Sequence, residues 1–322
     1  MQLPPHEFVK LRTLAETLTA LKSEDCQVKL ISGGTDVVFN MRGRLFQPDQ
    51  LVSIKDLPEL QRVEALDDGG IRIGAGCRLT DLERDPLVRH YPGLVAGIRA
   101  VASRHVRNIA TLGGNLCLDT RCWYVNQTAE WRAAKGPCLK TGREYCHAIK
   151  SSKTCVALNA SDTAPALIAL DAIATLASMD SQRDVPLSDF YTDDGVTHSV
   201  RQPDEVLVSI TIPPPHGTMI FIKETARTGN DFSYGAIAAL IADSGQVRLV
   251  LGSLTTKPLS LSEPARIVAL QGLTDASIDA AVNATRSEMG ALTNLYTPAA
   301  FKSTLARGLV RRALQELREQ SE

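Results

Sequence analysis

The cysteines between residues 122 and 155 are the first candidates for chemistry. This segment holds four of the chain's seven cysteines and both of its tryptophans. A reducing cytoplasm disfavours structural disulfides, and an odd number of cysteines points the same way. A dense group of cysteines in such a protein is more often a metal site or a redox site. The segment therefore indicates metal or redox chemistry before any other feature is considered.

Two glycine pairs are the second candidates. Gly33 and Gly34 occur in ISGGTD, and Gly113 and Gly114 occur in ATLGGN. Paired glycines adopt backbone conformations closed to other residues, so that consecutive N–H groups can face one concavity and bind a phosphate. Neither pair fits the G-x-G-x-x-G or Walker pattern, which disfavours a standard dinucleotide fold and a nucleotide triphosphatase. Plain tight turns and a cradle for a diphosphate-bearing cofactor both remain open.

The elements around the first glycine pair are predicted from local patterns. A capping box at Thr13 and Glu16 opens an amphipathic helix, and the runs 28–32 and 51–55 are predicted strands. A short helix is expected between these strands, directly after Gly34. This order of helix, strand, turn, helix and strand is typical of a small parallel α/β layer.

The rest of the chain is predicted to form two further parts. Alternating short strands and helices follow, and the strand-like run 206–212 ends at three prolines, 213–215, a plausible boundary. Strands and long helices follow the prolines. We therefore predict an α+β chain divided at residues 1–56, 57–215 and 216–322.

Composition excludes several classes of function. The formal net charge of −1 and the pI near 6.6 give no indication of nucleic acid or of an anionic membrane surface as a partner. The N-terminal residues lack an apolar signal region, and the longest apolar tract is interrupted by Asp171 and is shorter than the ~20 residues of a spanning helix. A cytoplasmic location without membrane attachment is the expectation.

Three segments resemble the marker regions of the FAD-binding subunits of the molybdenum hydroxylase family, which includes xanthine dehydrogenase and carbon monoxide dehydrogenase. They are KLISGGTDVVFNMR, RNIATLGGNLC joined to NASDTAPAL, and IFIKETARTGNDFSYGAIAA, and they occur in the family's order. The resemblance covers almost the whole chain. It implies a two-part FAD-binding domain, made of a small parallel α/β layer and a mixed sheet with helices, followed by a C-terminal α/β domain with an antiparallel sheet and helices.

The second marker region is split by an insertion at about residues 118–158. One branch of the family, the 4-hydroxybenzoyl-CoA reductases, carries such an insertion, which holds a [4Fe-4S] cluster. The resemblance implies that the cluster ligands are Cys122, Cys138, Cys146 and Cys155. A cubane cluster accepts thiolates from scattered loop positions, whereas structural zinc sites usually contain closely spaced ligand pairs. Zinc and a disulfide pair remain the alternatives, and His147 is expected to be hydrogen-bonded rather than a ligand.

The resemblance also implies the FAD contacts. Asp162 is expected near the adenosine part of FAD, and Lys223 near the pyrimidine edge of the flavin, where a cation favours the reduced, anionic ring. The alternatives are a helix cap for Asp162 and an exposed strand lysine for Lys223. The implied FAD-binding residues are Lys29, Leu30, Ile31, Ser32, Gly33, Gly34, Thr35, Asp36, Thr111, Gly113, Gly114, Asn115, Asp162 and Lys223.

The implied function is electron transfer within a larger enzyme. The chain has no molybdopterin region and no plant-type [2Fe-2S] pattern, so the resemblance implies a molybdopterin-binding large subunit and a [2Fe-2S] small subunit, expected as a dimer of heterotrimers. Electrons would enter from a low-potential donor such as reduced ferredoxin and pass through the [4Fe-4S] cluster and FAD to the partners, where 4-hydroxybenzoyl-CoA is dehydroxylated to benzoyl-CoA.

Two other functions and one question about the loop stay open. The chain could be the FAD subunit of a hydroxylating enzyme of the aldehyde, purine or carbon monoxide dehydrogenase type, passing electrons outward, or a zinc-held assembly module. Between Cys122 and Cys155, six lysines and arginines face two glutamates. This excess of positive charge either attracts an acidic ferredoxin or only keeps the loop soluble.

Overall fold

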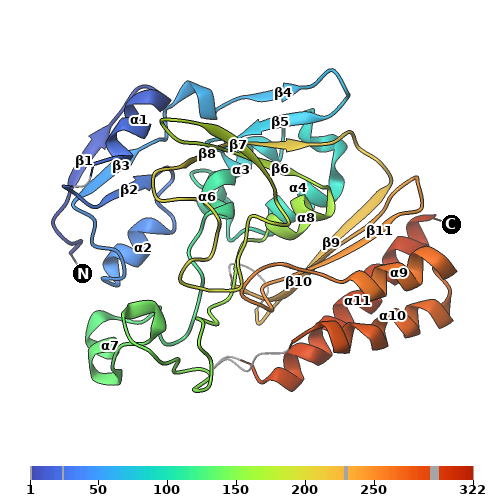
Figure 1. The fold of residues 1–322 in the computed structure, drawn as a ribbon. Coiled ribbons are helices and arrows are strands. Elements are labelled where there is room, and N and C mark those ends of the chain that lie inside the picture. Colours follow the sequence, from blue (N-terminus) through green and yellow to red (C-terminus); the bar gives the residue numbers. More distant parts are fainter. Residues whose placement is uncertain (1, 24, 228–230, 291–296, 322) are drawn as a thin grey trace.

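The N-terminal part forms the predicted parallel layer. A computed structural model describes residues 2–23, 25–227, 231–290 and 297–321. The first sheet has the strand order β1 (Glu7–Lys10), β3 (Gln50–Ser53) and β2 (Val28–Ile31), and both pairs are parallel (Figure 1). Helix α1 (Leu14–Leu21) begins with the predicted capping box, and α2 (Val37–Arg42) follows the first glycine pair. The sequence did not predict β1, whose Phe8 is 52% exposed and gives no apolar alternation.

The second sheet is antiparallel throughout, so the expected mixed sheet is wrong. Its neighbouring strands run antiparallel because β4–β5 and β6–β7 are hairpins and β8 returns between them. The strand order is β4 (Val63–Ala65), β5 (Ile71–Gly74), β8 (Val206–Ile212), β6 (Ile173–Ala177) and β7 (Gln182–Pro186). Its helices are η1 (Pro58–Leu60), α3 (Leu79–Leu82), η2 (Val88–His90), α4 (Pro92–Ala100), α5 (Arg104–Arg107), α6 (Leu112–Leu116) and α8 (Ala164–Ala169).

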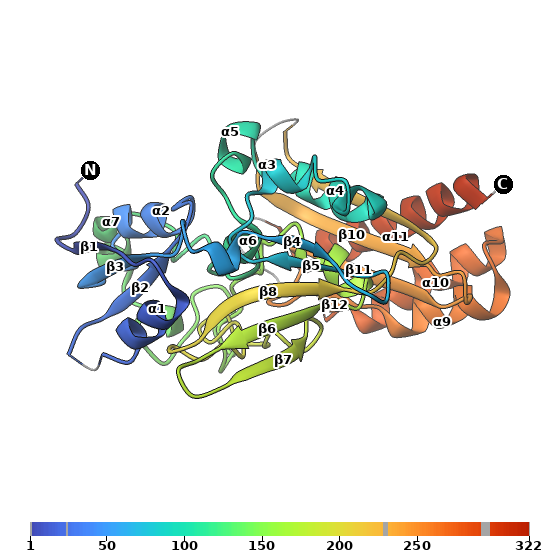
Figure 2. The same ribbon diagram turned by 90° about the horizontal axis from the view of Figure 1, so that it is seen from above.

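The third sheet is the predicted C-terminal antiparallel sheet. Its strand order is β12 (Leu259–Ser260), β11 (Val247–Gly252), β10 (Ser233–Ile241) and β9 (Thr218–Thr225). Three helices cover one face, namely α9 (Ser262–Gln271), α10 (Asp275–Glu288) and α11 (Ala299–Ser321). The other face packs on α4 and α8, so the sheet lies between two helical layers (Figures 1 and 2).

Two glycines allow this second packing to be close. A Cβ atom on Gly93 of α4 would lie 2.4 Å from Met219 Cγ of β9, and one on Gly252 of β11 would lie 2.6 Å from Pro165 Cγ of α8. Such distances leave no room for a side chain at either glycine. The backbone at each glycine therefore packs directly against a side chain of the facing element. The contact joins the second sheet's helices to the third sheet, and it places the segment before α8 beside β9.

The insertion leaves the body through a narrow neck. Arg121 and Leu158 exchange two backbone hydrogen bonds of 2.8 Å in an isolated antiparallel bridge. The segment between them contains α7 (Ala129–Lys135) and η3 (Leu139–Thr141), and it lies next to α2 (Figures 1 and 2). In the described part of the chain, no helix is both long and apolar enough to cross a membrane.

Candidate functional site

The two glycine turns are in direct contact. A Cβ atom on Gly33 would lie 1.9 Å from the carbonyl oxygen of Ile109 and 3.1 Å from the nitrogen of Ala110. Only a residue without a side chain fits there. Gly34 has a φ of +72°, the left-handed region that favours glycine. Residues far apart in the sequence therefore form one backbone-lined site, and this is the placement that a shared cofactor requires.

The second turn is held by its own side chains. Thr111 caps α6, and its Oγ1 accepts a hydrogen bond of 3.2 Å from the Gly114 nitrogen. Asn115 is buried, and its Oδ1 accepts bonds from Ser161 Oγ at 2.8 Å and from Thr163 Oγ1 at 2.7 Å. Asn115 therefore ties the second turn to the segment after the insertion. Its Oδ1 acts within the chain, so a cofactor would meet mainly the backbone of this turn.

Asp162 and Lys223 form a buried ion pair. Lys223 Nζ lies 2.7 Å from Asp162 Oδ2 and donates a second bond of 2.8 Å to the Ala100 carbonyl. Burial raises the pKa of Asp162 from 3.8 to about 6, against the lowering effect of Lys223. The two side chains touch, so a group bound at one of them would lie beside the other, and the part of FAD that each would contact stays a prediction. The helix-cap alternative for Asp162 is wrong, since Thr163 precedes α8, and Lys223 is not an exposed strand lysine.

The remaining predicted residues of the first turn differ in their surroundings. Lys29 of β2 lies with its Nζ 4.1 Å from the centre of the Phe46 ring, and burial lowers its pKa. Leu30, also in β2, packs on a small apolar cluster. Ser32 is half-buried, and its Oγ has no hydrogen-bond partner in the described structure. Ile31 ends β2, and Thr35 is exposed directly before α2.

The four cysteines of the insertion line one pocket. Figure 1 shows the insertion as a separate lobe that carries α7. Cys146 and Cys155 are buried, whereas Cys122 and Cys138 are partly exposed. The pocket is lined by Cys122, Cys138, Cys146 and Cys155 together with Tyr124, Val125, Leu139, Lys140, His147, Ala148, Val156 and Ala157. Sequence positions spread over the whole insertion thus meet in one place.

Each of these thiols accepts a hydrogen bond from the chain that follows it. Cys122 accepts from the N–H groups of Tyr124 and Val125, and Cys155 from that of Ala157. Cys138 accepts a hydrogen bond of 3.7 Å from the Thr141 hydroxyl, and Cys146 accepts one of 3.4 Å from the Ile149 nitrogen. Burial raises the pKa of Cys155 to about 11 and also raises that of Cys122. Bound metal would be needed to keep such thiols deprotonated at neutral pH.

Within the described residues, no three or more His, Cys, Asp or Glu side chains are grouped closely enough to hold a single metal ion. The cysteines instead lie on the wall of a shared pocket. A cubane cluster takes its thiolates at separate iron atoms, so its ligands surround a volume and do not converge on one point. The four cysteines thus share the wall of one pocket, and both the cluster and the ligand assignment stay predictions.

The aromatic residues of the insertion gather around His147. Its ring lies 5.0 Å from the rings of Tyr124 and Tyr145, and its Nε2 is 2.8 Å from the Gly136 carbonyl. His147 is thus hydrogen-bonded, as expected, while it also lines the pocket. The Trp131 ring lies 6.3 Å from that of Tyr124, and Trp123 and Trp131 are 41% and 36% exposed.

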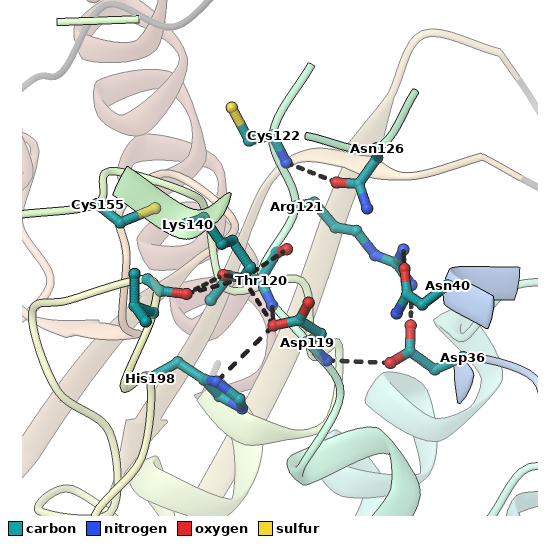
Figure 3. A network of polar contacts seen from close by, with 12 residues as sticks. Asp36, Asn40, Asp119, Thr120, Arg121, Cys122, Asn126, Lys140, Cys155 and His198 are labelled. Atoms are coloured by element: carbon teal, nitrogen blue, oxygen red, sulfur yellow. Dashed lines mark hydrogen bonds and ion pairs between the residues drawn. The ribbon is translucent and has the colours of Figure 1, made fainter. Parts of the chain in front are cut away.

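A polar network that the sequence did not predict connects the pocket to the first glycine turn (Figure 3). Asp36 forms an ion pair with Arg121 and accepts a bond of 3.1 Å from the Asp119 nitrogen. Asp119 pairs with Lys140 at 2.6 Å, and His198 lies 3.9 Å away. The carboxylate of Asp36, expected at the cofactor, is therefore used within the chain. No spacing in the sequence reveals these partners, because they come from separate loops.

Comparisons with known proteins agree with this geometry. Residues 5–215 match the family described as FAD binding domain in molybdopterin dehydrogenase, and residues 220–317 match the CO dehydrogenase flavoprotein C-terminal domain. The aldehyde oxidoreductase FAD-binding subunit PaoB of Escherichia coli K12 is 33% identical to this chain over 91% of this chain and 92% of its own length.

Two further relatives match over nearly their whole length. The carbon monoxide dehydrogenase medium chain of Hydrogenophaga pseudoflava is 23% identical over 97% of both chains. A solved structure of carbon monoxide dehydrogenase from that organism has a TM-score of 0.78 over 98% of each chain, and quinoline 2-oxidoreductase from Pseudomonas putida 86 has 0.79 over 99%. The predicted fold class is confirmed, apart from the antiparallel second sheet.

The first prediction concerns Gly33. Replacing it by alanine puts a Cβ atom against the Ile109 carbonyl, so the two turns must separate. We expect Gly33→Ala to lower FAD affinity at least about tenfold, which corresponds to ~1.4 kcal/mol of binding free energy. Flavin fluorescence titration measures this. Gly290→Ala is the matched control, because nothing lies within 4 Å of its added Cβ. Equal affinities of the two variants would show that the contact does not shape the cofactor site.

The second prediction concerns the pH dependence of stability. The folded chain raises the pKa of Asp162 from 3.8 to about 6, so it binds this proton more tightly than the unfolded chain does. The resulting contribution to stability is fully present below about pH 4 and is lost as the pH rises through about 6. We expect wild-type stability to fall in this window relative to Asp162→Asn. Urea unfolding of both FAD-free chains at several pH values measures the difference.

The control for this experiment is Asp67→Asn, which changes an exposed carboxylate. Its stability should follow that of the wild type at every pH. If Asp162→Asn also follows the wild type between pH 4 and 7, the Lys223 charge cancels the effect of burial on the pKa of Asp162.

Proposed function

The chain belongs to the FAD-binding subunits of the molybdenum hydroxylase family, and on that premise we propose that it is the electron-entry subunit of a 4-hydroxybenzoyl-CoA reductase. In this proposal the chain works in the cytoplasm with a molybdopterin-binding large subunit and a [2Fe-2S] small subunit, in a dimer of heterotrimers. It accepts electrons from a low-potential donor such as ferredoxin at the insertion and delivers them, through FAD, to its partners for the dehydroxylation of 4-hydroxybenzoyl-CoA.

The convergence of the four cysteines carries this proposal. Cys122, Cys138, Cys146 and Cys155 would hold a [4Fe-4S] cluster, which supplies one-electron transfer at low potential when it is bound. The hydrogen bonds that the thiols accept are of the kind that tune the potential of such a cluster. The buried apolar residues of the lobe, apart from its cysteines, are Val125, Val156 and Ala157, and no residue from 118 to 158 belongs to the three apolar clusters of the chain. A bound metal group would supply the missing stability.

The FAD site is supported by unsatisfied polar atoms. Ser32 Oγ and Asp162 Oδ1 are buried and have no hydrogen-bond partner in the described structure, and both belong to residues predicted to bind FAD. Buried polar atoms without partners are rare and call for an explanation, such as a missing ligand. The backbones of Gly33 and Gly34 and of Gly113 and Gly114 would hold the diphosphate. Lys223 and Asp162 would contact one part of the cofactor together.

The loop's positive charge divides into two groups. Arg132 donates to the Gly43 carbonyl at 2.6 Å, and Lys140 is paired with Asp119, so neither is available to a partner. The exposed cations are Lys135, Arg143, Lys150 and Lys153, which outnumber the exposed Glu130 and Glu144. These four residues are therefore the ones that would attract an acidic electron donor.

A second candidate function is favoured by the comparison with PaoB. That relative is named an aldehyde oxidoreductase subunit, and it matches this chain over 91% of its length. In this alternative the chain takes electrons from an aldehyde-oxidising partner and passes them outward. The two directions are separated by testing which substrate, an aldehyde or 4-hydroxybenzoyl-CoA with reduced ferredoxin, changes the flavin spectrum of the anaerobic complex.

The third prediction tests the ligands. Anaerobically purified wild-type protein should contain four irons, acid-labile sulfide and one FAD per chain, the content of one cluster and one flavin. Cys146→Ser should lose most of this iron, because Cys146 is buried at the pocket wall. Cys26→Ser, outside the insertion, is the control and should keep it. Full iron content in Cys146→Ser would contradict the ligand assignment. FAD with zinc in place of iron would support the hydroxylating alternative, and a protein without flavin would support the assembly module.

The fourth prediction tests docking. Changing Lys135, Arg143, Lys150 and Lys153 to glutamine should slow electron transfer from reduced ferredoxin about tenfold at low salt, the lower range of electrostatic steering. The difference should shrink as salt screens the charges. Stopped-flow reduction of the flavin measures the rate. The control changes four exposed cations outside the insertion, Lys10, Lys55, Arg84 and Arg89. Equal rates in the two variants would exclude docking at the loop.

A further inference from the structure

Lys140 is an unusual lysine for an external loop. Its side chain is only 10% exposed, and so is that of its partner Asp119. Its Nζ donates to Asp119 Oδ1 at 2.6 Å, to the Gly195 carbonyl at 2.8 Å and to Thr120, so its hydrogen-bonding capacity is filled by the protein. A buried cation with all its donors engaged acts on the structure around it and not on a partner in solution.

One side of this contact leads to the first glycine turn. Asp119 Oδ1 accepts a hydrogen bond from Lys140 Nζ. The backbone N–H of Asp119 donates a hydrogen bond of 3.1 Å to Asp36 Oδ2. The other oxygen of Asp36 receives Arg121. Asp36 precedes α2 without capping it, so its carboxylate serves only this network among the contacts of the described structure. Asp119 and Arg121 thus hold Asp36, at the end of the turn that would bind the FAD diphosphate, in place (Figure 3).

The other side leads to the cysteines. Lys140 follows Cys138 by two residues, and Arg121 directly precedes Cys122. Gly195, whose carbonyl receives Lys140, donates its N–H to the Cys155 carbonyl at 2.8 Å. A Cβ atom on Gly195 would lie 3.0 Å from Cys155 Sγ, so this loop directly contacts the pocket wall. The backbones of three of the four cysteines are therefore tied to one set of buried polar contacts.

We propose that Lys140 is a positioning residue that couples the cysteine pocket to the flavin-binding turn, so that occupancy of one site strengthens binding at the other. The identity of the two bound groups rests on the proposed function above, whereas the coupling rests on the contacts of Lys140. Lys140 Nζ has all its donors engaged, and breaking these contacts would leave a desolvated charge, which makes this part of the network stiff. Ordering the cysteines therefore orders Asp36, and by linkage the effect is reciprocal.

The fifth prediction compares FAD affinity with and without iron. In anaerobic protein, with whatever subunits accompany the chain, FAD should bind about 5- to 150-fold more weakly after a chelator has removed the iron, the usual range of such coupling. In Lys140→Met, which keeps a long side chain without charge, this ratio should fall to about one. Lys10→Met, which changes an exposed lysine outside the insertion, is the control and should keep the wild-type ratio.

Two further measurements separate the possible failures. If Lys140→Met does not assemble, Asp119→Asn replaces it, since it keeps an oxygen for Lys140 but loses the charge, and its ratio should also fall. If wild-type protein contains no iron, the proposed function fails, and the coupling through Lys140 is then tested with FAD alone. FAD should then protect residues 121–158 from proteolysis in the wild type but not in Lys140→Met. A wild-type ratio of about one, or equal ratios or equal protection in the wild type and Lys140→Met, would overturn the coupling.

Discussion

The close contact between Gly33 and the backbone of Ile109 is the constraint on which the cofactor site depends. It brings the end of β2 against the segment that leads into α6, although the two belong to different sheets. A site lined by backbone N–H groups from two turns suits a diphosphate, which carries its charge on several oxygens. The insertion begins just after α6, so the same contact also brings the cysteine lobe beside the first glycine turn.

Asp162 shows that the site is not optimised for stability. The folded chain holds this carboxylate where burial raises its pKa to about 6, although Lys223 lies 2.7 Å away. A neutral side chain of similar shape would avoid the cost of desolvation. Strongly shifted pKa values gather at functional sites for this reason. The free Oδ1 of Asp162 and the pair's position between α8 and β9 both fit a role at the cofactor.

The sequence predicted the elements better than the contacts between them. The capping box of α1 and the strands on either side of the first glycine pair are local patterns, and the structure confirms them. The sequence did not predict that the second sheet is antiparallel. The relative direction of two strands depends on which distant strand pairs with which, and no local sequence pattern determines this. The sequence also does not separate Lys140 from the other cations of the loop. Its partners, Asp119 and the Gly195 carbonyl, lie elsewhere in the chain. The cluster and the function of the loop stay predictions.

The cysteine lobe poses a physical problem that helps to explain its contacts. Its residues lie outside the three apolar clusters, and its tryptophans are partly exposed, so apolar burial contributes little to its order. Ordering a segment of this length costs on the order of 1–2 kcal/mol per residue in backbone entropy. The neck between Arg121 and Leu158 reduces that cost by fixing the two ends, and the Arg132 contact with Gly43 fixes α7 on α2. The lobe is held by its ends and by polar contacts, and the proposed cluster would add a link between the four cysteines that the network through Asp36 would pass to the first glycine turn.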